Sequence, residues 1–77
     1  MLKIKDNVDL KVLESDFEFS QAGDFYYHFF DEFNEIIIDQ PTRIIEIDGC
    51  VERTSLNKYN DILFALISAG LVEKVGE

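Results

Sequence analysis

The residues that could carry out nucleophilic chemistry occur only once each in this sequence. His28 is the only histidine and Cys50 the only cysteine. Nucleophilic catalysis needs a nucleophile, a base and a group that orients the base, and no flanking motif marks this pair as partners. His28 lies inside the aromatic run Phe25 to Phe30, and only Arg53 is near enough in sequence to activate Cys50. We therefore interpret both as structural residues and predict no catalytic site.

The sequence also lacks the ligand sets of the common metal and phosphate sites. A zinc site needs several histidines and cysteines, and this chain has one of each. The acidic segment Asp31 to Glu35 lacks the spacing of an EF-hand, and there is no glycine-rich phosphate loop. The carboxylates fall at expected strand ends and turns, where water solvates them. We therefore expect no metal, no cofactor and no enzymatic activity.

The distribution of charge indicates what kind of partner the protein binds. Sixteen acids face seven bases, for a formal net charge of −9, and no Lys or Arg lies between Lys11 and Arg43. Such a surface repels phosphate backbones and attracts basic partners. The alternative is that the acids only keep a small hydrophobic protein in solution.

Length and composition favour one folded domain over residues 1–77. The hydrophobic content of 47% is too high for intrinsic disorder. No apolar run approaches the roughly 18 residues of a membrane span, and the segment Met1 to Asp6 lacks the apolar core of a signal peptide. With a single cysteine, these features favour a reducing cytoplasm.

The N-terminal half predicts short elements. Residues 2–5 alternate as in an edge strand, and Asp6 or Asn7 can cap a helix over residues 8–15. Alternation predicts a strand over residues 17–19, a turn over 20–24 in which Gly23 takes a positive φ, and an aromatic strand over 25–30.

The C-terminal half predicts a hairpin and a helix. Strands over 35–39 and 43–48, joined at Pro41, place Ile38 opposite Ile45 and Ile36 opposite Ile47 on one buried face. A helix capped by Thr54 or Ser55 and ended by Gly70 carries an apolar stripe. The stripe consists of Leu56, Tyr59, Ile62, Leu63, Leu66 and Ile67. Residues 71–75 dock on the domain or add a last strand. The predicted class is α+β: a small antiparallel β-meander of three or more strands packed against a C-terminal helix, with a short N-terminal helix.

The opposite face of this sheet is the predicted partner-binding surface. The hairpin presents Glu35, Ile37, Asp39, Ile44, Glu46 and Asp48 there. For the aromatic strand we assign the more polar half, Tyr26, His28 and Phe30, to the same face. Apolar anchors inside a polar rim are the anatomy of a protein interface. The alternative is that the terminal segment or a homodimer mate covers this face.

Three segments of the chain resemble small proteins encoded by phages and prophages of Firmicutes. They are the opening, Met1 to Glu14, the hairpin strands Glu35 to Asp39 and Arg43 to Ile47, and parts of the ending, Asp61 to Leu63, Leu66 to Ile67 and Ala69 to Lys74. Small acidic phage proteins include inhibitors of bacterial defence such as anti-CRISPR proteins. The likeness to these inhibitors is one of size, charge and origin, and it assigns no functional residue. Together with the acidic sheet face, it leads us to expect a stoichiometric inhibitor that binds a basic, nucleic-acid-binding surface of a host defence protein, such as a CRISPR effector nuclease. The alternative is a small self-associating structural or assembly module.

The charge pattern makes a first prediction, which concerns nucleic acid. Because proteins hold phosphates mainly with Lys and Arg, we expect no direct binding to DNA or RNA at physiological salt. A gel-shift assay tests this, and a salt-sensitive micromolar affinity would contradict it.

Overall fold

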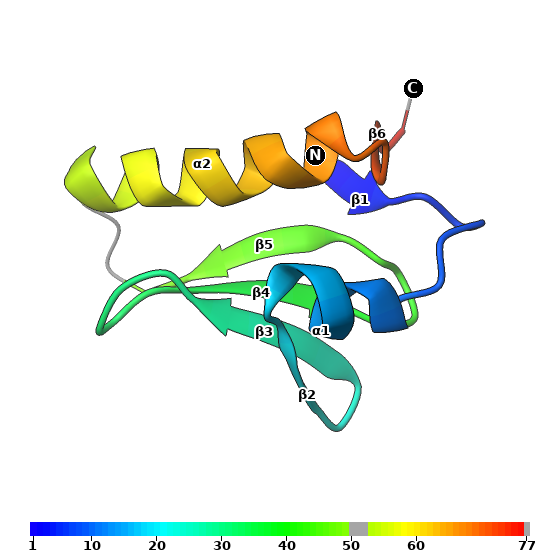
Figure 1. Ribbon diagram of the computed structural model, residues 1–77, viewed down its shortest axis with the longest axis horizontal. Coiled ribbons are helices and arrows are strands. Elements are labelled where there is room, and N and C mark those ends of the chain that lie inside the picture. The colour runs from blue at the N-terminus through cyan, green and yellow to red at the C-terminus, as the bar shows by residue number, and fades with distance from the viewer. Residues whose placement is uncertain (50–52, 77) are drawn as a thin grey trace.

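The computed structural model describes residues 1–49 and 53–76 of this protein, with side chains from residue 56 onward in the second range. It confirms the α+β class. A four-stranded antiparallel sheet has the order β2 (Ser20–Ala22), β3 (Phe25–Phe29), β4 (Glu35–Asp39) and β5 (Ile45–Asp48). The helix α2 (Arg53–Ser68) runs along one side of this sheet, as Figure 1 shows, and the shorter α1 (Lys11–Phe17) lies near β2.

The isoleucine hairpin forms as predicted. Ile38 pairs with Ile45 and Ile36 with Ile47. Ile36 and Ile38 are fully buried and Ile45 almost so, because directly opposed residues share one face of a sheet. This face, the inner face of the sheet, packs against the two helices through Leu13 of α1 and Leu66 of α2.

Arg43 ties this hairpin to the N-terminal segment. It has a left-handed backbone, with φ +63°, directly after the turn at residues 40–42. Its Nη1 donates hydrogen bonds to the carbonyls of Lys5 at 2.7 Å and Val8 at 2.6 Å, and its own carbonyl accepts from Ile4 N at 2.9 Å. A left-handed non-glycine residue costs roughly 1–2 kcal/mol, which these bonds offset. The return strand therefore begins at Ile45 and not at Arg43.

The first helix begins and ends later than predicted. Asp6, a predicted cap, instead accepts a hydrogen bond from Lys3 Nζ at 2.9 Å. The N-cap position is Leu10, and the Asp9 carboxylate accepts from Lys11 N at 3.0 Å. Helix α1 runs to Phe17 and stops at Glu18, which has φ +61°. The predicted strand over residues 17–19 is therefore wrong, and the predicted turn over 20–24 shrinks to Gly23 and Asp24, with Gly23 at φ +58°.

Helix α2 covers the inner face with part of its predicted stripe. Leu66 is fully buried, and Tyr59, Ile62 and Leu63 pack against the core, whereas Leu56 and Ile67 are exposed. Because the helix begins at Arg53, the predicted caps Thr54 and Ser55 fall inside its first turn.

Gly70 ends α2 as predicted, in a Schellman motif. It has φ +78°, its N–H donates to the Ile67 carbonyl at 2.9 Å, and Leu71 N–H donates to the Leu66 carbonyl at 3.2 Å. The chain then adds β6 (Val72–Lys74), which pairs antiparallel with β1 (Leu2–Ile4). The terminal segment therefore forms a strand with the other end of the chain instead of crossing the four-stranded sheet.

The burial of α2 generates a prediction about stability. Leu66→Ala should lower the free energy of unfolding by about 2–5 kcal/mol, because it leaves a cavity in the core. Phe64→Ala on the same helix removes a side chain that is 70% exposed and should cost about 0.5 kcal/mol or less. Urea denaturation measures both, and a Leu66→Ala loss as small as that of Phe64→Ala would contradict the packing.

Candidate interaction surface

The aromatic strand β3 faces the opposite way from the prediction. Tyr26 pairs with Ile38 and His28 with Ile36, so both lie on the inner face. Tyr26 is only 4% exposed and Phe30 only 9%. The assignment of Tyr26, His28 and Phe30 to the partner-binding face is therefore wrong, and neither Tyr26 nor Phe30 can anchor a partner without leaving the core.

A single residue in the connection between β3 and β4 accounts for the difference. The prediction implied a four-residue connection over 31–34, which would pair Phe30 with Glu35. The actual connection spans residues 30–34, so Phe29 pairs with Glu35 and every side chain of β3 changes face. Phe30 turns into the core, where its ring centroid lies 6.1 Å from that of Tyr59.

Asp31 and Gly49 hold this connection in place. The Asp31 carboxylate accepts hydrogen bonds from the backbone N–H of Phe33 and of Asn34, and from the Asn34 side-chain amide, at 2.9–3.0 Å. Phe30 N–H donates to the Asn34 carbonyl at 3.1 Å. Gly49, with φ +130°, packs so closely on this loop that a Cβ would collide with the Asn34 side chain and the Phe33 carbonyl. Asp31 therefore has a structural role.

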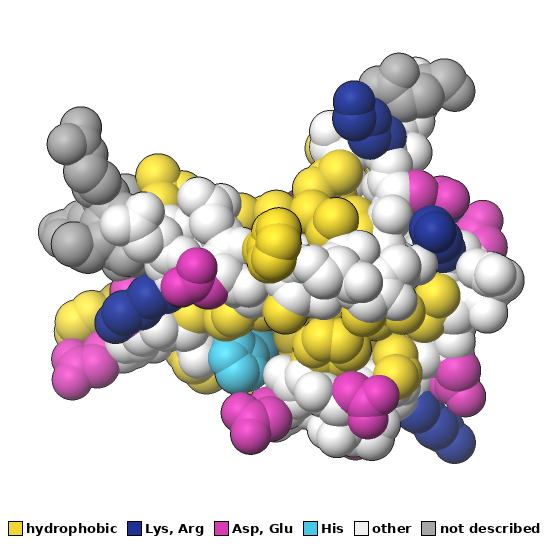
Figure 2. Space-filling model, turned by 45° about the horizontal axis from the view of Figure 1, so that its top comes forward, with side chains coloured by type: hydrophobic (Ala, Val, Ile, Leu, Met, Phe, Trp, Pro, Cys, Tyr) yellow, Lys and Arg dark blue, Asp and Glu magenta, His cyan; other side chains and the backbone are white. Residues whose placement is uncertain are grey.

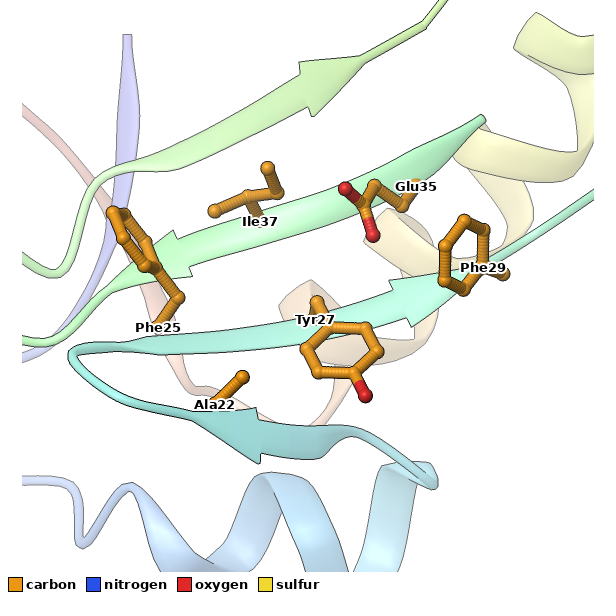
Figure 3. Close-up of a pocket in the computed structure, with 6 residues that line it drawn as sticks. All are labelled: Ala22, Phe25, Tyr27, Phe29, Glu35 and Ile37. Carbon is orange, nitrogen blue, oxygen red and sulfur yellow. The ribbon is translucent and has the colours of Figure 1, made fainter. Parts of the chain in front are cut away.

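The outer face of the four-stranded sheet carries an apolar groove of about 370 Å³. Figure 3 shows its six lining side chains projecting from the strands, with α2 passing behind them. They are Ala22, Phe25, Tyr27, Phe29, Glu35 and Ile37. Phe25 is 47% and Phe29 57% exposed, and the Tyr27 and Phe29 rings meet edge to face with centroids 5.9 Å apart. The sequence analysis missed the three aromatic residues and Ala22.

Carboxylates lie beside this groove, as predicted. The register puts Glu35 and Asp39 of β4, and Glu46 and Asp48 of β5, on the same face as Ile37. The four strands contain no Lys or Arg. The Asp39 carboxylate also holds the hairpin turn, since it accepts from Thr42 Oγ1 at 2.8 Å and from Thr42 N at 3.2 Å.

Ile44 has a different environment from the one predicted. It precedes β5, is half-buried and bridges to Lys3 of β1. It therefore lies at the junction with the N-terminal strand and is not one of the residues that line the groove.

His28 lines a second cleft, of about 330 Å³, between α1, β3 and α2. Its Nδ1 lies 3.1 Å from the Glu18 carbonyl oxygen, which can only accept, so Nδ1 is the donor. Its ring packs on Phe19 with centroids 5.4 Å apart. The acids Asp16, Glu18 and Asp61 also line the cleft, and Figure 2 shows the histidine at the surface with acidic side chains nearby. No Ser, Thr or Cys is among the described residues that line it.

Two further observations concern the described ranges only. Within them, no group of three or more His, Cys, Asp or Glu side chains is placed to hold a metal ion. Neither described helix combines the length and the apolar character that crossing a membrane requires. Cys50, considered above as a nucleophile, lies outside the described residues.

No family model, no curated protein and no solved structure matches the chain. The two faces of the sheet therefore provide the evidence on function.

The inward position of Tyr26 predicts a loss of stability at alkaline pH. Burial, followed by the negative charges of Glu14 and Asp9, raises the pKa of Tyr26 above its usual value of about 10. The folded state favours the protonated phenol, so its contribution is complete below about pH 10 and is lost as the pH rises through the raised folded pKa.

Tyr26→Phe removes this ionisable group, so we expect its unfolding free energy to fall less steeply than that of wild type above about pH 10. The unfolding free energy of the variant should still fall somewhat with pH, because burial also raises the pKa of Tyr59. Urea denaturation between about pH 8 and 11.5 compares the two proteins. Identical slopes would mean that the Tyr26 phenol is not buried in the fold.

Proposed function

We propose that this protein is a non-enzymatic binding protein that attaches to a basic surface of another protein through the outer face of its four-stranded sheet. The main support for this proposal is the composition of that face, on which Phe25, Tyr27 and Phe29 lie next to carboxylates. Large apolar groups that gather at a surface usually mark a binding site, and aromatic residues with a charged rim are typical of protein interfaces.

The charge of the face selects the kind of partner. Glu35, Glu46 and Asp48 lie on strands that contain no base. Burying carboxylates without a compensating charge is costly, so the partner surface has to supply cations. Basic surfaces of this kind are common where proteins hold nucleic acid.

The resemblance to small phage and prophage proteins supports a biological setting for such binding. Within this proposal the protein is a phage-encoded stoichiometric inhibitor that occupies the nucleic-acid-binding surface of a host defence protein in the host cytoplasm. An anti-CRISPR protein acting on an effector nuclease is one example of the class.

Electrostatics alone would be too weak for this task. One strand of duplex DNA carries a charge about every 3.4 Å along the axis, whereas outward residues of a β-strand, such as Glu46 and Asp48, repeat about every 6.8 Å. The acids therefore resemble only part of a nucleic-acid backbone. Their main effect is on the rate of encounter, and the aromatic groups have to supply much of the affinity.

Self-association is the second candidate function, and two observations favour it. The outer face exposes aromatic groups, and β2 is an edge strand of its sheet. Against it, a second copy brings only further acids and aromatic groups to the face, so the carboxylates of both copies would be buried without cations. Size-exclusion chromatography with light scattering separates these cases, because our proposal predicts a monomer.

The decisive experiment starts with affinity capture from a bacterial lysate that contains nucleic-acid-dependent defence proteins. Wild type is compared with Phe29→Ala on the outer face and with Phe64→Ala on α2. The genuine partner should be retained by Phe64→Ala and depleted by Phe29→Ala. Its binding to nucleic acid, measured by gel shift, should fall as the inhibitor approaches equimolar concentration. A partner retained equally by both variants would rule out the outer face.

Surface plasmon resonance on the purified partner then separates the two kinds of residue. Glu46→Lys should lower the association rate constant by about tenfold and weaken its dependence on salt. Phe29→Ala should raise the dissociation rate constant, because it removes an anchor. Asp39 is unsuitable for charge reversal because its carboxylate holds the turn. If the association rate of Glu46→Lys equals that of wild type at every salt concentration, the acids do not steer binding.

A further inference from the structure

The outer face of the sheet is organised in rows that run across the strands from an aromatic ring to a carboxylate. The strand register defines these rows, because residues that pair directly lie side by side. The rows are Phe29–Glu35–Asp48, Tyr27–Ile37–Glu46 and Phe25–Asp39. An aromatic column therefore follows β3, and an acidic column follows β5.

Strand geometry gives the dimensions of this pattern. Directly paired side chains have Cβ atoms about 4.5–5.5 Å apart, and successive rows are separated by two residues, about 6.8 Å. A cation placed over the Phe29 ring therefore has the Glu35 carboxylate beside it. In Figure 3, Phe29, Glu35 and Tyr27 lie together around one end of the groove.

We propose that this end of the groove binds arginine side chains of the partner protein. The guanidinium plane stacks on the ring of Phe29 or Tyr27, and its N–H groups donate to the Glu35 carboxylate. This assignment rests on the proposed function, since it specifies how a basic partner is recognised. The spacing of the rows further suits two arginines that are two residues apart on an extended segment, because their side chains repeat at about the same 6.8 Å.

Arginine fits this site better than lysine. Its guanidinium is planar and weakly hydrated, it stacks on aromatic rings, and it presents parallel N–H donors to a carboxylate. Lysine offers a compact, strongly hydrated charge that gains less from a ring. Single-stranded nucleic acid also stacks on aromatic groups, but its phosphates would lie close to Glu35 and Glu46.

The test uses NMR titration of the isotope-labelled full-length protein with short extended peptides. Three peptides carry Arg, Lys or the neutral isostere citrulline at alternating positions and are otherwise identical. Glu35→Gln and Phe29→Leu probe the site. The matched controls on α2 are Asp61→Asn, which removes one charge, and Phe64→Leu, which removes one exposed ring.

We expect the Arg peptide to bind wild type about fivefold or more tightly than the Lys peptide, a difference of about 1 kcal/mol. The citrulline peptide should bind more weakly than either. Glu35→Gln and Phe29→Leu should each weaken Arg binding by about fivefold to tenfold and bring the Arg-to-Lys ratio close to one. The two α2 variants should change every affinity by less than about twofold. Shifted resonances should cluster on β3 and β4.

Several outcomes would overturn the inference, and they are distinguishable. Equal binding of the Arg and Lys peptides to the outer face rejects the arginine site and leaves the proposed function intact. If no outer-face variant alters binding, or if no cationic peptide binds, both the arginine site and the proposed function are rejected. If Asp61→Asn weakens binding of the Arg peptide, the cation binds in the His28 cleft and the arginine site on the outer face is rejected. Oligouridine is titrated in parallel, and if it binds more tightly than the Arg peptide, the arginine site is rejected and the face is a nucleic-acid platform.

Discussion

The register between β3 and β4 determines which side chains of this protein are buried and which can meet a partner. Pairing Phe29 with Glu35 sends Tyr26 inward to Ile38 and puts the other half of β3 on the outer face. There Phe25 and Phe29 are exposed and Tyr27 is half-buried. A shift of one residue would exchange these sets completely. The five residues of the connection fix the choice, because the Asp31 carboxylate ties the backbone there and Phe30 contacts Tyr59 of α2. The outer face therefore depends on a few hydrogen bonds at one end of the sheet.

The inner and outer faces of the sheet need different side chains, and alternating residues of the same strands provide them. On β4, Ile36 and Ile38 are fully buried on the inner face, whereas the alternate residues Glu35 and Ile37 line the groove on the outer face. A domain of this size has little stability to spare, yet Phe25 and Phe29 are exposed on the outer face instead of contributing to the core. Arg43 does not neutralise the acidic surface, because its guanidinium holds the N-terminal segment through two backbone carbonyls. The carboxylates of the outer face therefore receive no hydrogen bond from Arg43 Nη1.

Much of the fold can be predicted from local sequence patterns, whereas the proposed binding surface can be predicted only in part. The hairpin register, the inner isoleucine face and the glycine end of α2 come from alternation, turn length and helical spacing, which short segments specify by themselves. Glu35, Ile37, Glu46 and Asp48 were assigned to the outer face for the same reason. Local patterns do not predict which side chains of β3 point inward, because this depends on whether Phe30 belongs to the strand or to the connection. Polarity favoured the wrong half, since the buried half contains Tyr26 and His28. The start of α1 differs from the prediction because two hydrogen bonds hold the segment before it. One is local, from Lys3 to Asp6, and the other is long-range, from Arg43 to the Val8 carbonyl.

Photochemically induced nuclear polarisation measures the exposure of the β3 side chains, and so it tests the register that places Tyr27 on the outer face. In this experiment a dye excited by light polarises only tyrosine and histidine rings that it can touch. Tyr27 should give a strong signal and Tyr26 none, and an arginine-containing peptide should suppress the Tyr27 signal. A strong Tyr26 signal with a silent Tyr27 would show that the sheet presents the other face, and the binding surface described above would then be wrong.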